Sequence, residues 1–362
     1  MTLLHRLYPE LAAAFPCLPL AELPTPVTET DAFSDSGARV FIKHDEATSP
    51  RYGGNKARKL GWLLGAAAAR GAKAVITFGG AGSNHALATA VHATALGMRC
   101  TSILGPQHNA HAVRRNLLRA LAAGARLRPC AWRDTSREAV RCFWEDTDRD
   151  GLMPTVIPPG GSSPAGALGF VEAAFELREQ VRAGLLPEPD ALYVPSGTMG
   201  TCVGLALGLA AAGLKTRVEA VRVTTAPHTS PEHAAALFAR TLRLLREACP
   251  AFPECALDGD RFRIRDEFFG AEYALYTPES AEMVRFARAR MGLSLEGTYT
   301  GKALAALHAD AASGRLRGQT ALFWNTYNGP PSGPEPPSGE YRRLPALLQT
   351  YFDQPVQPLD RD

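Results

Sequence analysis

The chain has 362 residues, two to three times the usual size of a single domain, so we expect two domains. Hydrophobic residues make up 46% of the chain and charged residues 21%, which excludes a disordered protein. With 39 basic and 36 acidic residues, the net charge of +3 is too small to indicate a nucleic-acid or membrane-surface partner. Few of the basic residues are lysines, so each lysine is a candidate for chemistry that needs an amine.

Cysteine usage and the apolar segments indicate in which cellular compartment the protein resides. The 7 cysteines form no C-x-x-C pair and no metal-site spacing with histidine, which predicts reduced thiols and no metal site. Arg6 and Glu10 interrupt the first fifteen residues, which therefore do not resemble a signal peptide. The longest apolar run, from Val203 to Leu214, is too short to cross a bilayer. We expect a soluble, cytoplasmic protein.

From residue 39 onward, short β-rich segments alternate with Ala- and Leu-rich helical segments. In chain order, strands are predicted at 39–44, 74–78 and 100–104, with helices over 55–69, 85–96 and 111–123. A Pro/Gly/Ser-rich segment at 151–164 predicts a crossing between domains. The pattern then resumes with strands at 191–195 and 218–223 and helices over 201–213 and 231–248. This alternation predicts an α/β fold with mostly parallel sheets.

Residues 51–64 form the first of three loops that stand where such folds bind ligands. Two glycines precede Asn55 and Lys56, at the start of a helix that also carries Arg58 and Lys59. One interpretation is a cationic first turn on a solvated face. However, positive charge opposes the dipole at a helix start. Both the dipole and burial lower the pKa of an amine, as a nucleophilic lysine requires.

Residues 77–90 form the second loop, where Ser83, Asn84 and His85 follow a strand and precede an Ala-rich helix. Ser and Asn are common helix caps, so the loop is explained by capping alone. The alternative is that the helix-start amides and these side chains bind a carboxylate. The loop by itself does not distinguish the two.

Residues 194–210 form the third loop, a Ser/Gly/Thr-rich turn between a strand and a helix. Its small residues and the hydroxyls of Ser196, Thr198 and Thr201 suit an anion. The loop lacks both nucleotide patterns, G-x-x-x-x-G-K-[ST] and G-x-G-x-x-G. It therefore predicts a single phosphate, the alternative being a tight turn without a ligand. A reactive lysine, a phosphate loop and a carboxylate loop together indicate pyridoxal 5′-phosphate (PLP) and an amino-acid substrate.

Six segments, in this order, resemble the D-cysteine desulfhydrase / 1-aminocyclopropane-1-carboxylate (ACC) deaminase family: GGNKARKL, GGAGSNHALATA, PPGGSSPAGALGFVEAAFEL, PSGTMGTCVGL, RDEFFGAEYALYTPE and TYTGKAL. The resemblance runs from residue 23 to about residue 328. It implies the tryptophan-synthase-β-like fold (PLP fold type II) with two doubly wound α/β domains. Residues 1–57 and 166–362 would form the large PLP-binding domain and residues 58–165 the small one. The resemblance also implies a homodimer.

The resemblance implies a role for each matched residue. Lys56 matches the Schiff-base lysine, Asn55 the ligand of the phenolic oxygen of PLP, and Thr326 a partner of the pyridine nitrogen. The substrate carboxylate would be bound by Ser83, Asn84 and His85, and Tyr273 and Tyr299 would face the substrate. The phosphate would be bound by Ser196, Gly197, Thr198, Met199, Gly200 and Thr201, with Met199 where the family usually has glycine. Where the family usually reads His-Thr-Gly-Gly, this chain has Asn325-Thr326-Tyr327-Asn328.

These matches predict a lyase in which Lys56, Ser83 and Tyr299 are catalytic. Resembling ACC deaminases follow the matched tyrosine with Glu, whereas Thr300 follows Tyr299 here. We therefore predict α,β-elimination on a small amino acid such as D-cysteine, giving pyruvate and ammonia, with no nucleic-acid or membrane partner. The alternatives are ACC deamination and a non-catalytic PLP-binding protein. A nucleotide- or NAD-binding oxidoreductase is disfavoured by the missing pyrophosphate loop.

Overall fold

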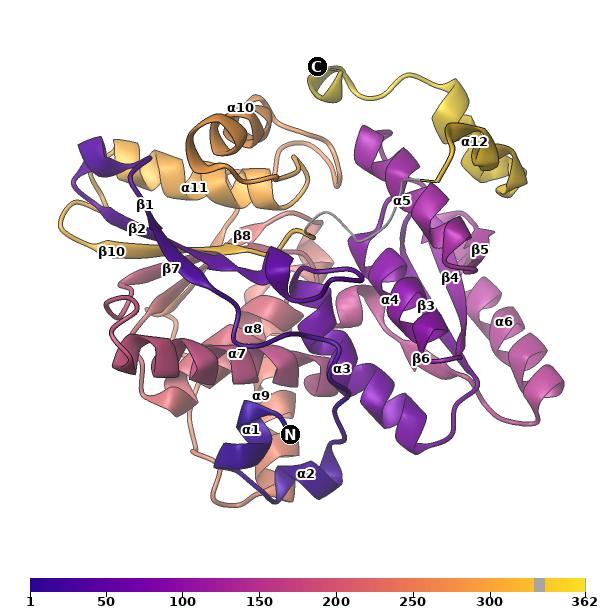
Figure 1. Cartoon of the computed structure of the whole chain (residues 1–362), viewed down its shortest axis with the longest axis horizontal. Helices are drawn as coiled ribbons and strands as arrows, with labels where there is room; N and C mark the ends of the chain where they lie inside the picture. The colour runs from indigo at the N-terminus through magenta and orange to yellow at the C-terminus, as the bar shows by residue number, and fades with distance from the viewer. Residues whose placement is uncertain (329–335, 362) are drawn as a thin grey trace.

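The protein, described here by a computed structural model over residues 1–328 and 336–361, is built on two separate β-sheets (Figure 1). The larger sheet has six strands in the order β1-β2-β10-β7-β8-β9, and the smaller has four in the order β5-β4-β3-β6. All neighbouring strands run parallel except β1 and β2. The predicted α/β fold with two parallel sheets is confirmed.

The larger sheet brings segments that are far apart in the sequence to one edge. Its strands are β1 (Val27–Thr30), β2 (Arg39–His44), β10 (Thr320–Asn325), β7 (Ala191–Ser196), β8 (Arg217–Arg222) and β9 (Phe262–Arg265). Asn325 pairs with His44, and Ser196 pairs with Arg222. The carboxyl ends of these strands therefore lie together, where ligands of such sheets bind.

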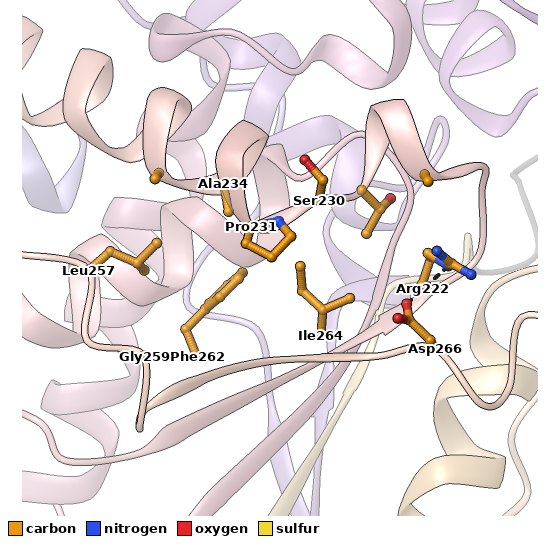
Figure 2. A pocket seen from close by; sticks show the side chains of 12 residues that line it. Arg222, Ser230, Pro231, Ala234, Leu257, Gly259, Phe262, Ile264 and Asp266 are labelled. Atoms are coloured by element: carbon orange, nitrogen blue, oxygen red, sulfur yellow. Dashed lines mark ion pairs between the residues drawn. The ribbon is translucent and has the colours of Figure 1, made fainter.

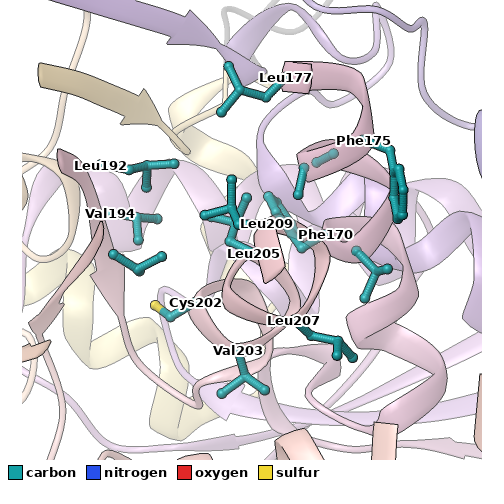
Figure 3. Close-up of a cluster of buried hydrophobic side chains, with 14 of the residues drawn as sticks. Phe170, Phe175, Leu177, Leu192, Val194, Cys202, Val203, Leu205, Leu207 and Leu209 are labelled. Carbon is teal, nitrogen blue, oxygen red and sulfur yellow. The ribbon is translucent and has the colours of Figure 1, made fainter. Parts of the chain in front are cut away.

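Helices cover both faces of the larger sheet. One face carries α7 (Pro164–Arg182), α8 (Gly200–Ala212) and α9 (Pro231–Ala248), and the other α10 (Pro278–Phe286) and α11 (Thr300–Ala312). Phe170 of α7 and Leu205 of α8 pack with Leu192 of β7 in the core (Figure 3). The central strands β7 and β10 are buried along their whole length because helices cover both faces of the sheet.

Glycines let α8 approach α7 closely. A Cβ at Gly204 would lie 2.6 Å from the carbonyl oxygen of Ala167, and one at Gly208 would lie 2.5 Å from that of Val171. No larger residue fits at either position without a backbone shift. This packing fixes α8, the helix that begins at the predicted phosphate loop.

The smaller sheet consists of β5 (Arg126–Pro129), β4 (Arg99–Gly105), β3 (Ala74–Gly80) and β6 (Thr155–Ile157). It is packed by α3 (Asn55–Ala69), α4 (Asn84–Ala95), α5 (His111–Ala122) and α6 (Thr135–Asp150). The ten strands and helices predicted from residue 39 onward are all present, each with bounds within two residues of the prediction.

We call the smaller sheet with α3 to α6 the smaller unit, and the larger sheet with its covering helices the larger unit. The C-terminal segment, residues 336–361, packs on the smaller unit (Figure 1). Its helix α12 (Ala346–Asp353) contributes Leu348 to the core around α4 and α5. The carbonyl oxygen of Tyr351 accepts hydrogen bonds from Asn109 and Arg114, each at 2.8 Å. The helix α12 thus buries its apolar side against α5. The strands of the smaller sheet do lie within 58–165, and the domain boundaries themselves remain a prediction.

Short elements complete the described chain: α1 (Leu3–Leu7), α2 (Leu11–Ala14), the turns η1 (Ser34–Ser36), η2 (Asp45–Ala47), η3 (Trp132–Asp134), η4 (Pro159–Gly161), η5 (Ala226–His228), η7 (Ser338–Arg343) and η8 (Pro358–Asp360), and the π-helical turn η6 (Ala287–Met291). Within residues 1–328 and 336–361, no helix has both the length and the apolarity needed to cross a membrane. In the same residues, no three His, Cys, Asp or Glu side chains are grouped to hold a metal ion.

Candidate active site

Lys56 lies in the first turn of α3, where the chain leaves the larger sheet for the smaller one. The preceding Gly54 has a φ of 88° and packs against β10, since a Cβ there would lie 2.9 Å from the carbonyl oxygens of Thr326 and Tyr327. Only glycine meets both requirements. The backbone amide of Asn55 donates to the Thr326 oxygen at 3.2 Å, which fixes the helix start beside the end of β10.

Buried ionic contacts anchor the same helix one turn further on. Arg58 donates to Asp45 at 2.8 Å and to Glu176 at 2.9 Å, and these three side chains are 0–5% exposed. Burial would raise the pKa of Glu176, but Arg58 and Lys43 lower it to about 2, so this carboxylate stays charged. From the sequence, Arg58 was recognised only as part of a cationic turn and was not predicted to anchor the helix. Its carboxylate partners are distant in sequence, so no local pattern reveals them.

The amine of Lys56 has the properties of a reactive group. Burial lowers its pKa to about 8, and its Nζ makes no hydrogen bond to any described residue. Lys59, one turn along α3, is 1% exposed and donates to the carbonyl oxygen of Gly160 and to Ser162, at 3.1 and 3.3 Å. Burial and the neighbouring Lys56 hold the pKa of Lys59 well below its usual value. Neither amine has a carboxylate partner among the described residues, so this cluster is suited to an anionic ligand.

The predicted phosphate loop, residues 196–201, joins β7 to α8 directly beside these amines. A Cβ at Gly200 would lie 2.8 Å from the Nζ of Lys59, which shows how close the loop is to that cation. The side chain of Asn55 donates to the hydroxyl of Thr201 at 3.1 Å. One amide hydrogen of Asn55 is thus committed to the loop, and the other remains for a ligand.

Met199 occupies a left-handed position, with a φ of 65°, where glycine is the usual residue. Its side chain is 1% exposed and belongs to the core between the sheet, α7 and α8. The hydroxyl of Ser196 donates to its sulfur at 2.9 Å. The thioether is therefore packed in the core. Having methionine here in place of glycine does not put a side chain between the loop and a bound anion.

A second loop, at Gly160 to Ser162, completes the anion site. Ser162 lies 2.7 Å from the hydroxyl of Thr198 and accepts from the amide of Gly200 at 3.1 Å. Gly160 has a φ of 64°, and a Cβ there would lie 2.2 Å from the Thr198 hydroxyl, so glycine is required. From the sequence, this segment was predicted to be a crossing between domains and part of the family resemblance, and neither Lys59 nor Ser162 was given a ligand role. The PPGGSSP composition was the available signal.

The carboxylate loop lies at the start of α4 in the smaller unit. The Ser83 hydroxyl caps the helix by accepting from the amide of Ala86 at 3.2 Å, and its own hydrogen is free to donate. The Asn84 oxygen accepts from Tyr52 and Asn116, at 3.2 and 2.9 Å, which leaves its NH₂ group for a ligand. The capping and ligand-binding interpretations of this loop are therefore compatible.

His85 is placed differently from its two neighbours. Its side chain is 3% exposed, and its Nε2 lies 3.0 Å from the hydroxyl of Thr77 in β3. A Cβ at Gly161 would lie 3.2 Å from its ring. Burial, together with Lys56 and Lys59, holds its pKa well below the usual value, so the imidazole is neutral. The side chain thus supports the loop at Gly161, and only the backbone of His85 stays at the helix start.

The two predicted tyrosines come together from separate elements. The hydroxyls of Tyr273 and Tyr299 are 2.7 Å apart. A Cβ at Gly197 would lie 3.7 Å from the Tyr299 ring, and one at Gly80 would lie 3.4 Å from the Tyr273 ring. The pair therefore stands between the phosphate loop and the end of β3. Burial raises the pKa of both phenols, so they are protonated donors at neutral pH.

Glu296 is a buried carboxylate that the sequence analysis missed. It accepts from the amides of Thr298, Tyr299 and Thr300 at 2.7–3.0 Å and so caps α11. Burial raises its pKa, while these amides act in the opposite direction. The Thr300 hydroxyl accepts from the amide of Glu296 at 3.1 Å. The side chain of Thr300 is therefore part of this cap and is fully buried.

The end of β10 carries Thr326 and the residues that depart from the family pattern. The side-chain nitrogen of Asn325 is buried without a hydrogen-bond partner among the described residues. Tyr327 is turned toward the smaller unit, where its hydroxyl accepts from Arg115 at 2.7 Å. An unpaired buried donor at the end of β10, the strand end that the start of α3 contacts, is consistent with a site for a polar cofactor.

The C-terminal segment reaches the loop that carries Tyr273. The side chain of Gln357 accepts from the amide of Tyr276 at 2.7 Å and donates to the carbonyl oxygen of Ala274 at 3.1 Å. Its backbone amide donates to Asn109 in the smaller unit at 2.9 Å. Beside it, Glu272 pairs with His108 at 2.7 Å. The loop of Tyr273 is thus tied to the smaller unit at both of its ends.

This geometry fits PLP. The phosphate would be held by the 196–201 loop, Ser162 and Lys59, and the aldehyde would meet the amine of Lys56. Asn55 keeps an N–H for the phenolic oxygen, Asn84 keeps its NH₂ group for the substrate carboxylate, and Thr326 directly follows β10. The half-buried amine of Lys56, the buried amine of Lys59 and the unpaired Asn325 donor are polar groups that such a ligand would satisfy.

Comparisons with known proteins agree with this interpretation. The family model for pyridoxal-phosphate dependent enzymes matches residues 18–326. Nocardicin C-9′ epimerase from Nocardia uniformis subsp. tsuyamanensis is 35% identical over 337 residues, covering 90% of this chain and 97% of its own length. A putative ACC deaminase from Pyrococcus horikoshii is 34% identical, covering 87% and 93%.

Solved structures show the same fold. The crystal structure of an ACC deaminase homologue has a TM-score of 0.74 and 30% identity, covering 94% of this chain and 98% of that one. Threonine deaminase isoform 2 from Solanum lycopersicum, at 16% identity and a TM-score of 0.60, shares the fold. From the family match and the full-length relatives, we conclude that the chain belongs to the family of pyridoxal-phosphate-dependent enzymes, with pyridoxal 5′-phosphate as its cofactor.

Proposed function

We propose that the enzyme catalyses α,β-elimination on a small amino acid such as D-cysteine, giving pyruvate and ammonia. The observation that carries the proposal is the position of Thr300. Its side chain is neutral, and its hydroxyl is held in the α11 cap by the amide of Glu296. The nearby carboxylate of Glu296 is engaged by the backbone amides of Thr298, Tyr299 and Thr300. The ACC deaminases that the sequence resembles have Glu at this point. Without that carboxylate, expulsion of a good leaving group such as a thiolate is easier than opening a carbon ring.

Lys56 is the proposed base. Bound PLP withdraws electrons from the substrate and makes its Cα–H acidic. Because burial lowers the pKa of Lys56 to about 8, a substantial fraction of its amine is neutral near pH 7 to 8 and able to accept that proton at Nζ. The constellation contains no other strong base, since His85 is turned away and both tyrosines are protonated.

The carboxylate and side chain of the substrate would be held by the smaller unit and by the tyrosines. The Ser83 hydroxyl and the first-turn amides of α4 suit the carboxylate, which is also favoured by the positive end of that helix. The protonated hydroxyls of Tyr273 and Tyr299 suit a leaving group that becomes negative. A phenol donor near a departing thiolate stabilises it without becoming charged itself.

Product analysis with a panel of substrates tests the proposal. We expect pyruvate from D-cysteine or a close β-substituted analogue at a kcat/KM at least about tenfold above that for ACC, equivalent to about 1.4 kcal/mol. Lys56→Ala should remove both the turnover and the visible absorption of the bound cofactor. Efficient ring opening of ACC, with D-cysteine inert, would contradict the proposal and support ACC deamination. Cofactor binding without turnover of any amino acid would support a non-catalytic role.

Epimerisation is a second candidate, favoured by the 35% identity to nocardicin C-9′ epimerase. Inverting an α-carbon needs a proton carrier on each side of it, and the Tyr273–Tyr299 pair is a proton-bearing group besides Lys56. Incubation of single enantiomers in D₂O separates the two reactions. Recovery of the opposite enantiomer with deuterium at Cα, without pyruvate, would establish epimerisation in place of elimination. The homodimer and the cytoplasmic location remain predictions from the sequence.

A further inference from the structure

A cavity of about 550 Å³ lies in the larger unit, between the start of α9 and the strands β8 and β9 (Figure 2). Its volume is in the range of small-molecule sites. None of the residues predicted to bind cofactor or substrate lines it. The proposed elimination reaction makes no use of this cavity.

The cavity has an apolar floor and one charged end. Leu257, Phe262 and Ile264 provide large apolar side chains, and Figure 2 shows them around the hollow opposite α9. Arg222 and Asp266 stand together at the other end, with an N–O distance of 3.0 Å. Their side chains are 21% and 60% exposed, so both charges are accessible to a ligand.

This layout matches one class of small molecule. A guanidinium binds a carboxylate through paired hydrogen bonds, and an adjacent carboxylate binds an ammonium group. A free amino acid carries both groups on one carbon, and an aliphatic or aromatic side chain would cover the apolar floor. A simple carboxylate or a simple amine would engage only one partner of the Arg222–Asp266 pair.

The wall of the cavity is joined to the predicted phosphate loop. Thr229 lines the cavity and donates to the carbonyl oxygen of Gly197 at 2.5 Å. Arg222 is also the ladder partner of Ser196, the first residue of that loop. A ligand that shifts Thr229 or Arg222 therefore acts on a segment that holds the cofactor phosphate.

We propose that this cavity is an effector site for a free amino acid with an apolar side chain, and that its occupancy changes the affinity for PLP through Thr229. The proposal rests on the cofactor and is independent of which reaction the enzyme catalyses. By linkage, PLP must change the affinity for the effector by the same factor.

Calorimetric titration tests for the site directly. Holoenzyme reduced with borohydride has its cofactor locked to Lys56, so amino acids cannot bind there by replacing the lysine. We expect L-leucine or L-phenylalanine to bind this form with one site per chain, while hexylamine and hexanoate bind much more weakly. Ala235→Phe, which puts a large ring at a small lining residue, should abolish binding. Ala236→Phe is the matched control, because Ala236 is exposed on the same helix and does not line the cavity.

Cofactor titrations of the unreduced protein test the coupling. We expect the effector to change the PLP dissociation constant by about fivefold or more, the usual range of such coupling. Thr229→Val should keep effector binding and lose most of this change. Binding that survives Ala235→Phe, or no binding by any apolar amino acid, would overturn the site. Binding with an unchanged PLP affinity would overturn the effector role.

Discussion

At the residue scale, the depressed pKa of Lys56 has a direct consequence for cofactor attachment. Only the neutral amine attacks the PLP aldehyde, and the neutral fraction of Lys56 rises with pH until the pH exceeds its pKa. With a pKa of about 8, as burial of Lys56 dictates, this fraction levels off above pH 9. An ordinary lysine, with a pKa near 10.4, would continue to gain about tenfold per pH unit up to pH 10.

We therefore predict that the rate of PLP capture by cofactor-free enzyme rises by about tenfold between pH 7 and 9 and then levels off. Stopped-flow absorbance against pH measures this rate, and a small-molecule amine of ordinary pKa provides the reference for the pH dependence of free PLP. A rate that keeps rising to pH 10 would show that the amine is solvated rather than buried.

Ser83 combines a structural and a functional role in one hydroxyl. Its oxygen caps α4, and its hydrogen is available to the substrate carboxylate. We predict that Ser83→Ala lowers stability by about 1 kcal/mol through the lost cap. It should also lower kcat/KM by about ten- to a hundredfold, as expected for a lost hydrogen bond to a charged group.

Measuring melting temperature and kinetics on the same variant separates the two roles of Ser83. Ser230→Ala is the matched control, because Ser230 caps α9 in the same way, accepting from the amide of His233 at 3.2 Å. This control should lose a similar stability with unchanged turnover. Equal kinetic effects in both variants would mean that Ser83 acts only through the fold.

The sequence predicted residues that carry their own local signal. Asn55-Lys56, the Ser83-Asn84 helix start and the Ser/Gly/Thr turn at 196–201 all stand at strand–helix junctions, where spacing and composition are informative. Lys59, Ser162 and Glu296 were missed because their importance depends on contacts between distant segments, such as the one between Ser162 and Thr198. His85 was assigned to the substrate with its neighbours, yet its side chain turns to Thr77, a direction that composition cannot reveal.

At the element scale, strand and helix positions followed from the alternation of β-rich and Ala/Leu-rich segments. The five strands predicted from the sequence are mostly buried on both faces, so they read as apolar runs. Pairing between remote elements was harder to predict. The docking of α12 on α5, for instance, depends on Leu344 and Leu348 finding an apolar face more than 200 residues earlier in the chain. The segment around Gln357 extends this docking to the loop of Tyr273.

We predict that Gln357→Ala raises KM several-fold while PLP content stays normal. The variant loses the two hydrogen bonds that hold Ala274 and Tyr276, and so loosens the loop that presents Tyr273 to the substrate. Two such bonds contribute about 1–3 kcal/mol together, so a modest drop in melting temperature should accompany the change. Gln354→Ala is the control, because Gln354 is exposed on the same segment and its side chain makes no hydrogen bond to the described residues.

Steady-state kinetics at several temperatures below the melting transition decide between positioning and simple destabilisation. If Gln357 acts through Tyr273, the change in KM persists at temperatures where the variant is fully folded. A variant whose only defect is a lower melting temperature would contradict the positioning role.

At the scale of the whole molecule, the cofactor would join the two units. Lys56, Lys59 and the 196–201 loop come from the larger unit and the start of α3, whereas Ser83 and Asn84 belong to the smaller unit. Contacts that bridge the units without a ligand include Tyr327 with Arg115 and Gln357 with Asn109. PLP would add further bridging contacts beside the half-buried Lys56 and the buried Lys59, two amines without a carboxylate partner among the described residues.

We predict that removing PLP lowers the melting temperature and loosens the smaller unit selectively. A ligand present at a hundred times its dissociation constant stabilises the folded state by about 2.7 kcal/mol, which corresponds to a shift of about 3–4 °C for a chain of this length. Hydrogen exchange should increase mainly in α4 and in the loop at Gly160 to Ser162, which contact the anion site but not the centre of the larger core.

Adding back PLP should restore the protection, whereas pyridoxal without its phosphate should restore it only in part, because Lys59 and Ser162 would still lack an anion. Equal protection by pyridoxal and PLP would contradict a phosphate site formed by the 196–201 loop, Lys59 and Ser162.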